Sequence, residues 1–218
     1  TLYLFGGHDG SARNDLWVYN VPAKTWTQLS PLSPPGGPPS ARWALSASPT
    51  VFDETTKKLY LFGGWDGGAR NDLWVYDTAT NAWVQLTPTG GPPPVRHWHS
   101  TMFDPATRQM YVFGGHTGGA NLNDLWVYDL AANAWTPLTP TGGLPSARHG
   151  AGVGFDGATK TLYLFGGHDG SARNDLWVYR IPTNTWTQLS PLSPPSGPPS
   201  ARWVHSAGFD ETPKKLYL

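Results

Sequence analysis

One sequence unit occurs four times in the 218-residue chain, and this repetition constrains the fold more than any other feature. Its marker, Phe-Gly-Gly, begins at Phe5, Phe62, Phe113 and Phe165, so successive units lie 57, 51 and 52 residues apart. Each marker is followed by Asn-Asp-Leu-Trp-Val-Tyr, which begins at Asn14, Asn71, Asn123 and Asn174. A Pro-rich stretch then ends in Arg42, Arg96, Arg148 or Arg202. The chain is therefore one supersecondary unit used repeatedly.

Each unit contains four short segments of strand composition, called a, b, c and d in chain order. In the third unit they cover 97–103, 110–113, 125–128 and 134–138. These runs are rich in aromatic and aliphatic residues and are bounded by Gly, Asn, Asp and Pro, as strands are. No segment has the length and period of an amphipathic helix. A four-stranded antiparallel meander repeated about an axis is a propeller blade, so we expect an all-β β-propeller with four blades in this chain.

Three features of the unit resemble the kelch-repeat family over the whole chain. They are the double Gly after segment b, the Tyr of segment c (Tyr19, Tyr76, Tyr128, Tyr179) and the spaced Trp of segment d (Trp26, Trp83, Trp135, Trp186). The resemblance implies a kelch-type propeller. Physically, the Gly pair permits a close backbone approach that a Cβ would block. The Trp and Tyr side chains are expected to fill the space between neighbouring blades.

The repeat boundaries are predicted at about 1–40, 41–94, 95–146 and 147–200, with strand a of a closing blade at 201–209. Residues 1–43 and 161–203 are identical at 38 of 43 positions. The chain opens inside a segment b and stops at the start of another, at 216–218. Two interpretations stay open. One is a closed four-bladed ring, in which the last segment a pairs with the first segment b; the other is part of a larger ring, since kelch-family rings commonly have about six or seven blades.

Composition excludes several classes of function. Lys plus Arg and Asp plus Glu both number 15, so the chain lacks the basic excess that drives binding to nucleic acids or anionic membranes. No apolar run approaches the about 18 residues of a membrane-spanning helix. With no Cys, disulfides and Cys-ligated metal centres are excluded, and we expect no cofactor. Abundant Trp, Thr, Pro and Gly with only 14% charged residues favour an extracellular or cell-surface location, with a cytoplasmic one left open.

The b–c and d–a loops of an up-and-down meander emerge on the same face, and binding residues favour loops on a rigid scaffold. The kelch resemblance implies the same face for a partner. The candidate ligand-binding residues lie in or beside these loops: His8, Arg13, Arg42, Trp65, Arg70, Arg96, His97, His99, His116, Arg148, His149, His168, Arg173 and Arg202. We therefore predict a protein or glycan ligand on this face.

Each candidate also has a structural explanation. Arg42, Arg96, Arg148 and Arg202 could ring the channel and grip a carboxylate or sugar, but their recurrence in every unit favours bonds to loop carbonyls. The side chains at the tips of the b–c loops could stack on a ligand or pack over their own loop. His97 and His99 are expected on one strand face at a metal-compatible spacing, yet no third ligand is evident, so no metal is predicted.

The recurring carboxylates are expected to serve structure. Asp15, Asp72, Asp124 and Asp175 recur in every unit and are predicted to accept bonds from the loop backbone rather than to catalyse a reaction. Asp9, Asp66 and Asp169 lack the alternating pattern of a calcium loop. The a–b turns begin with Asp after Phe52, Phe103, Phe155 and Phe209, where Asp or Thr can bond the turn backbone.

The leading hypothesis is a non-enzymatic binding or interaction scaffold. Glu54 and Glu211 are the only Glu residues, and no nucleophile elbow, phosphate loop or His-Glu-x-x-His motif is present. One alternative is a carbohydrate-acting lyase, isomerase or hydrolase of kelch type. Another is a structural, assembly or designed repeat protein that self-associates through open strand edges.

Overall fold

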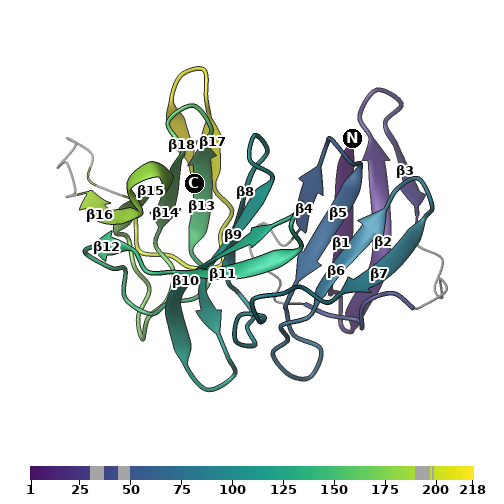
Figure 1. Cartoon of the computed structure of the whole chain (residues 1–218), viewed down its shortest axis with the longest axis horizontal. Helices are drawn as coiled ribbons and strands as arrows, with labels where there is room; N and C mark the ends of the chain where they lie inside the picture. The colour runs from purple at the N-terminus through teal and green to yellow at the C-terminus, as the bar shows by residue number, and fades with distance from the viewer. Residues whose placement is uncertain (30–36, 44–49, 190–196, 198) are drawn as a thin grey trace.

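The computed structural model describes residues 1–29, 37–43, 50–189, 197 and 199–218. These residues form a series of antiparallel sheets, with a single short 3-10 helix at Ile181–Thr183 (Figure 1). The first sheet contains β1 (Leu2–His8), β2 (Ala12–Asn20) and β3 (Thr25–Gln28). The second contains β4 (Thr50–Asp53), β5 (Lys58–Phe62), β6 (Leu73–Asp77) and β7 (Ala82–Leu86).

The third sheet contains β8 (Ser100–Asp104), β9 (Gln109–His116), β10 (Asn121–Asp129) and β11 (Ala134–Leu138). The fourth contains β13 (Gly152–Asp156), β14 (Thr161–Phe165), β15 (Leu176–Arg180) and β16 (Thr185–Leu189), and a short strand, β12 (Thr141–Gly142), joins its outer edge. A last hairpin pairs β17 (Gly208–Asp210) with β18 (Lys215–Tyr217). The predicted four-stranded antiparallel blades of kelch type are confirmed.

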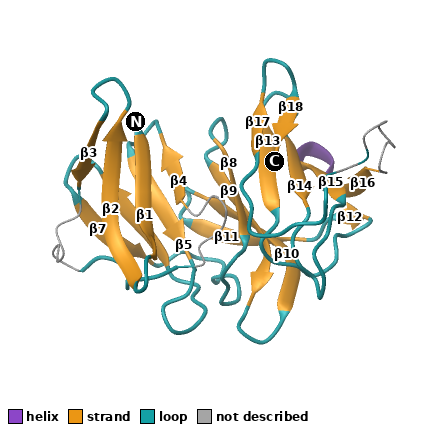
Figure 2. Cartoon of the chain, turned by 180° about the vertical axis from the view of Figure 1, so that it is seen from behind, coloured by secondary structure: helices purple, strands orange, loops and turns teal. Residues whose placement is uncertain are grey.

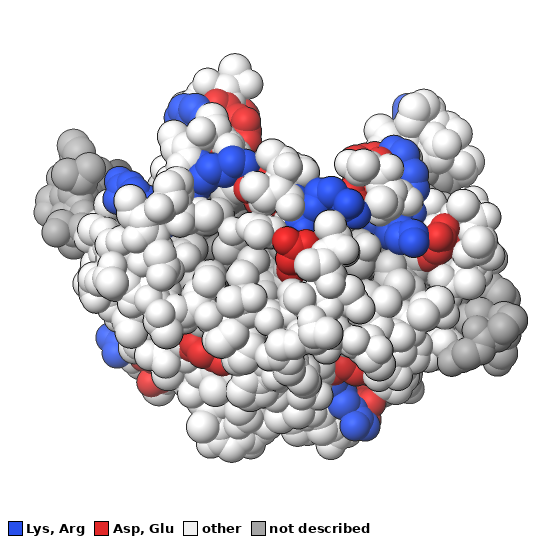
Figure 3. All heavy atoms as spheres, in the orientation of Figure 1, with Lys and Arg blue, Asp and Glu red and all other residues white. Residues whose placement is uncertain are grey.

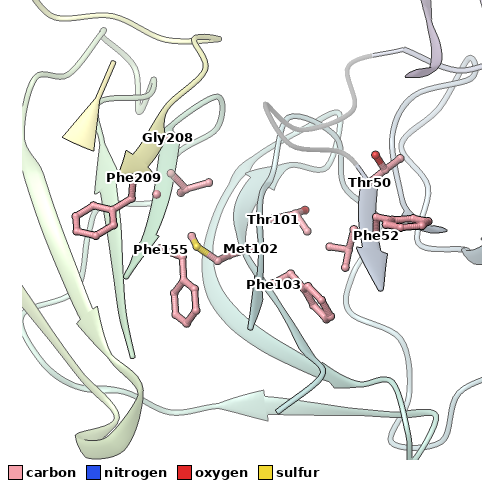
Figure 4. A pocket seen from close by; sticks show the side chains of 11 residues that line it. Thr50, Phe52, Thr101, Met102, Phe103, Phe155, Gly208 and Phe209 are labelled. Carbon is pink, nitrogen blue, oxygen red and sulfur yellow. The ribbon is translucent and has the colours of Figure 1, made fainter. Parts of the chain in front are cut away.

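The sheets follow one another in an arc with their first strands innermost, as the views from the two sides show (Figures 1 and 2). The inner strands β4, β8, β13 and β17 lie in contact in that order. They line a hollow of about 280 Å³ whose walls include Phe52, Met102, Phe103, Phe155 and Phe209 (Figure 4). This hollow marks the centre of the arc.

The pairing expected for a closed four-bladed ring is absent from the described residues. In that ring the last inner strand would pair with β1. Instead β17 pairs with β18, and the partner of β1 is β2. The first sheet accordingly has three strands, because β1 corresponds to segment b and no strand a is paired to its inner edge.

Aromatic side chains fill the seams between neighbouring sheets, as predicted, at three of the four expected positions. The Trp of each outer strand packs against the Phe of the preceding sheet: Phe5–Trp83 at 5.1 Å, Phe62–Trp135 at 4.9 Å and Phe113–Trp186 at 5.2 Å between ring centroids. These three Trp side chains are at most 2% exposed. The prediction is wrong for Trp26, which is 50% exposed because the described residues contain no preceding sheet for it to pack against.

The glycines after segment b allow the expected close approach. Gly114 has φ +60°, and a Cβ there would lie 2.6 Å from the carbonyl oxygen of Arg148 in the next sheet. A second approach was not predicted. Gly142 of β12 has φ +84°, and a Cβ on it would lie 2.3 Å from the carbonyl oxygen of Trp186. Glycine therefore lets the d–a loop run as a parallel strand beside β16.

Candidate functional site

An arginine ties together each complete sheet at the loop end of its strands. The buried Arg96 donates from Nη1 to the Gly114 carbonyl (2.9 Å) and to Asp124 Oδ1 (2.8 Å). Its Nη2 donates to Asp124 Oδ2 at 2.7 Å, which completes a bidentate ion pair. Two further pairs have the same geometry, Arg42 with Asp72 and Arg148 with Asp175. The ion pair links the start of the inner strand to the start of the third strand.

These arginines have little left for a ligand. All five N–H groups of Arg42 are used, since Nε also donates to the Ser40 carbonyl, Nη1 to the Gly63 carbonyl and Nη2 to the Ser40 hydroxyl. Arg148 makes the equivalent bonds with Ser146 and Gly166. The geometry therefore supports a structural role for Arg42 and Arg148, in which they bond loop carbonyls and an aspartate rather than a ligand. Among the described residues, Arg202 pairs with no Asp and donates only to Ser200.

Three of the recurring aspartates, Asp72, Asp124 and Asp175, bind mainly the arginine side chains, whereas the sequence predicted acceptors for the loop backbone. Asp15 has no such arginine partner among the described residues. All four accept the indole N–H of the Trp two residues later, at 2.7 Å for Asp175 and Trp177. Burial raises the pKa of Asp175, but the bonds from Arg148 and Trp177 outweigh it and the pKa is lowered. Sequence reasoning missed this partnership because the two residues lie 27 positions apart.

The loop arginines are engaged with carboxylates in their own b–c loops. Arg13, Arg70 and Arg173 pair with Asp9, Asp66 and Asp169 four residues earlier, with N···O distances of 2.6, 2.6 and 2.7 Å. Asp66 and Asp169 also accept a hydroxyl from the preceding d–a loop, that of Ser40 and Ser146 respectively. In each of these b–c loops the positive charge of the arginine is thus balanced by the negative charge of the aspartate. The rest of the d–a loops at 30–36, 190–196 and 198 lies outside the described residues.

Aromatic and imidazole rings form a continuous group at the loop end of the arc, which we call the mouth cluster. It consists of the residue after each Gly pair, the residue after each recurring arginine, and Trp98: His8, Trp43, Trp65, His97, Trp98, His116, His149, His168 and Trp203. Rings from adjacent sheets meet at centroid distances of 4.8 Å for Trp65–His97 and 5.5 Å for His116–His149. The cluster therefore crosses the seams between sheets.

Backbone pairing fixes these rings in place. Within the third sheet, His97 and His116 exchange two N–H···O bonds of 3.0 and 2.9 Å, and Trp43 with Trp65 and His149 with His168 do the same in their sheets. The imidazole Nδ1 atoms of His8, His116 and His168 accept the backbone N–H two residues later in their own loops. These b–c loop residues thus both pack over their loops and contribute a ring to the shared surface.

Trp98 lies among the other rings in a left-handed backbone conformation, with φ +51°. Its ring contacts Trp43 at 6.0 Å, stacks on His149 at 5.3 Å and meets Trp203 at 5.8 Å. The positive φ breaks the strand alternation, so the prediction that His97 and His99 share one strand face is wrong. His97 reaches the mouth cluster, whereas His99 lies buried beside Phe62, with ring centroids 5.5 Å apart.

The mouth cluster lines an open hollow of about 280 Å³ with no Asp, Glu, Lys or Arg side chain in its wall. Its lining consists of Trp43, Trp65, His97, Trp98, His116, Gly118 and His149. Burial lowers the pKa of His97 and of His149 to about 4, so both imidazoles are neutral near pH 7. Within the described part of the chain, no three His, Asp or Glu side chains are arranged to hold a metal ion.

Three members of the mouth cluster were not among the predicted site residues: Trp43, Trp98 and Trp203. A signal was present, because Trp43 and Trp203 occupy the position that His97 and His149 occupy, directly after the recurring arginine. Of the predicted residues, His99 lies away from this surface. Its side chain is 1% exposed, burial lowers its pKa to about 3, and neither ring nitrogen has a partner among the described residues.

Charged side chains also lie at the opposite edge of the molecule. Figure 3 shows them gathered along the upper edge of the view, where the a–b turns lie in Figure 1. Cations there bridge to the turn carboxylate of the preceding sheet: Arg108–Asp53, Lys160–Asp104 and Lys214–Asp156 at 2.7, 2.7 and 3.0 Å. The turn aspartates also bond their own turns, as predicted. Ion pairs thus occur at both edges, and the aromatic mouth cluster distinguishes the loop end from the turn edge.

Comparison with known proteins identifies repeats of one family throughout the chain. A family model described as the KLHDC2/KLHL20/DRC7 Kelch-repeats domain matches residues 1–218. The chain is 40% identical over 196 residues to human Leucine-zipper-like transcriptional regulator 1, covering 83% of this chain and 21% of that protein. It is 31% identical over 212 residues to bovine Kelch domain-containing protein 3, covering 88% of this chain and 51% of that protein.

A nematode relative is more distant. Host cell factor homolog hcf-1 of Caenorhabditis elegans is 28% identical over 227 residues, covering 94% of this chain and 28% of that protein. The chain thus spans about half, or less, of the length of these three relatives. Among the described residues, no helix has the length and hydropathy needed to span a membrane.

Proposed function

The chain belongs to the kelch-repeat family, and on that premise we propose that it is a protein-interaction scaffold that holds its partner on the b–c and d–a loop face. The mouth cluster would form the centre of that contact. Kelch-repeat homologues support the general role. The loop face is favoured because it carries an uncharged aromatic hollow bordered by neutralised Asp–Arg pairs, the arrangement of an apolar centre with a polar rim.

The observation that carries this proposal is Trp98. A large side chain at φ +51° is strained, and the position does not need one: Gly150 occupies the equivalent place in the next repeat at φ +65°. The two backbones are coupled in the same way, since the Gly150 N–H donates to the Trp98 carbonyl and the Val204 N–H to the Gly150 carbonyl. The indole is thus dispensable for the backbone geometry, and contact with a partner explains its presence.

The test is a Trp98→Gly variant, which removes the indole and keeps a residue suited to the left-handed backbone. Peptides selected from a random library on the folded chain should bind the variant at least about tenfold more weakly, as expected for an aromatic anchor. Val204→Gly is the matched control, because Val204 has the same φ and does not line the hollow. If no selected peptide depends on Trp98, the proposal is wrong.

A further inference from the structure

Two imidazoles in the wall of the mouth hollow have opposite hydrogen-bonding roles. The Nδ1 atom of His116 accepts the backbone N–H of Gly118 at 3.0 Å. An accepting ring nitrogen carries no proton, so in the neutral imidazole the proton is on Nε2. His116 therefore presents a donor on the side of the ring that faces away from its own loop.

His149 has the other tautomer, and Asn121 determines this. The Asn121 side-chain Nδ2 donates to the His168 carbonyl at 3.3 Å, which identifies the other end of the amide as its oxygen. That oxygen lies 2.7 Å from His149 Nδ1, so Nδ1 must carry the proton and donate it. The Nε2 atom of His149 is then an acceptor, and it has no hydrogen-bond donor among the described residues.

The donor and the acceptor lie on adjacent rings that line the same hollow. The centroids of His116 and His149 are 5.5 Å apart, with the ring planes at 74°. The rest of the wall consists of three indoles, Gly118 and the neutral His97. A hydroxyl is a group that donates and accepts through one atom, so it can satisfy both imidazoles at once. An ionised group would lose its hydration and find no opposite charge in the wall.

The size of the hollow further limits which ligands can fit. At about 280 Å³ it lies just below the about 300–1,000 Å³ typical of pockets for whole drug-sized ligands, so it suits one side chain rather than a longer ligand. The indoles of Trp43, Trp65 and Trp98 require an apolar, preferably aromatic body. A sugar would bring several hydroxyls, of which the His116–His149 pair can bind one. Tyrosine combines an aromatic body with a single terminal hydroxyl.

We infer that the mouth hollow takes a tyrosine side chain of the protein partner, with its ring among the three indoles and its hydroxyl between His116 and His149. This inference rests on the proposed function and names the chemistry that the partner must present. Phenylalanine would fit the indoles but leave both imidazole nitrogens unpaired. Phosphotyrosine would place a dianion beside uncharged walls, so phosphorylation of the partner would prevent binding.

The experiment uses the Trp98-dependent peptides from the random library, titrated onto the full chain. We expect a tyrosine at one fixed position, and its replacement by phenylalanine should weaken binding by about tenfold or more, as for other sites built to pair a hydroxyl. In a His149→Phe protein, the tyrosine and phenylalanine peptides should bind within about twofold of each other. His168→Phe is the matched control and should retain the preference, since His168 lies outside the wall of the hollow.

Other outcomes separate the two proposals. If the Trp98-dependent peptides carry no fixed tyrosine, or bind equally well with phenylalanine, the tyrosine inference is overturned and the interaction scaffold stands. Displacement of these peptides by methyl glucoside, methyl galactoside or methyl mannoside would also overturn it, in favour of a sugar. If the library yields no Trp98-dependent peptide, both proposals are contradicted.

Discussion

Residues 1–43 and 161–203 share 38 of 43 residues and fold into equivalent strands, yet their environments differ greatly. Leu162 and Leu164 of β14 are 2% and 0% exposed, whereas the identical Leu2 and Leu4 of β1 are 56% and 52% exposed. On the other face of β1 and β14, the two copies make the same contact. Tyr3 stacks on Phe52 at 4.8 Å and Tyr163 stacks on Phe209 at 5.2 Å.

The difference lies in which neighbour is present. Both copies have a following inner strand on one face, but only the second copy has a preceding sheet on the other, where Leu162 and Leu164 join the core with Met102, Tyr111 and Phe113. Local sequence therefore selects strands and turns, and the adjacent sheet decides what is buried. This pair of segments is an internal control, because the same substitution can be made in two settings.

The largest contrast should come from the outer-strand tryptophans. Trp186→Ala should lower the free energy of unfolding by about 3–5 kcal/mol, because it empties a fully buried seam. Trp26→Ala should cost less than about 1 kcal/mol, since the side chain is 50% exposed and its one ring contact among the described residues is with Tyr19. Urea unfolding followed by circular dichroism measures both. Equal losses would mean that the outer face of the first sheet is covered in solution, which sedimentation at the same concentration would detect.

The ion pairs should give the next largest contrast. Asp175→Ala would leave the buried Arg148 guanidinium without its carboxylate and should cost about 3 kcal/mol. Asp15→Ala removes a bond to Trp17 alone and should cost about 1 kcal/mol or less. Combining Arg148→Met with Asp175→Ala should recover part of the loss, because no unpaired charge is then buried. A double variant no more stable than Asp175→Ala would contradict this account of the pair.

Buried histidines should make the inner part of the arc sensitive to mild acid. Burial lowers the pKa of His99 to about 3, so below about pH 6.5 the unfolded chain binds a proton that the folded chain excludes. The stability that His99 contributes is complete above that pH and is lost as the pH falls, by roughly 2 kcal/mol at pH 5.

Substituting leucine tests this pH dependence in two settings. His99→Leu should reduce the fall in the urea midpoint between pH 7 and pH 5. The equivalent His205 lies half-buried near the last hairpin, and burial lowers its pKa as well, so His205→Leu should have the same sign with a smaller size. Carboxylates whose folded pKa is lowered titrate below this window. A fall in midpoint that His99→Leu leaves unchanged would show that another group is responsible.

The repeat pattern predicted the strands, the close backbone contact at the Gly pairs and the tryptophans between the sheets. Each of these depends on local sequence or on packing against a neighbouring copy of the same unit. It could not predict the exposure of Trp26, which depends on the position of the sheet in the array. The pairing of Arg96 with Asp124 joins residues 28 positions apart and needed the register of the blade. Trp98 was missed because a positive φ at a tryptophan has no local sequence signal. An extracellular location stays a prediction.

The smallest contrast concerns the b–c loop aspartates. It tests whether the effect of a neighbouring sheet extends from the strands to the loops. Asp169 is 5% exposed and accepts both Arg173 and the Ser146 hydroxyl of the preceding d–a loop. Burial raises its pKa, but these bonds outweigh it and lower the pKa to about 2. Asp9 has the same loop sequence, is 56% exposed and, among the described residues, bonds only within its own loop.

Asp169→Asn should therefore lower the free energy of unfolding at pH 7 by about 1 kcal/mol, a modest value because Arg173 is half-exposed. Asp9→Asn should leave the urea midpoint unchanged within error. Ser146→Ala separates the causes, because it removes the contact with the neighbouring loop and keeps the ion pair. Two results would contradict this account: no loss of stability in Ser146→Ala, and equal losses in Asp169→Asn and Asp9→Asn. The Asp–Arg pair within each loop would then determine loop stability, and a neighbouring sheet would affect the strands but not the loops.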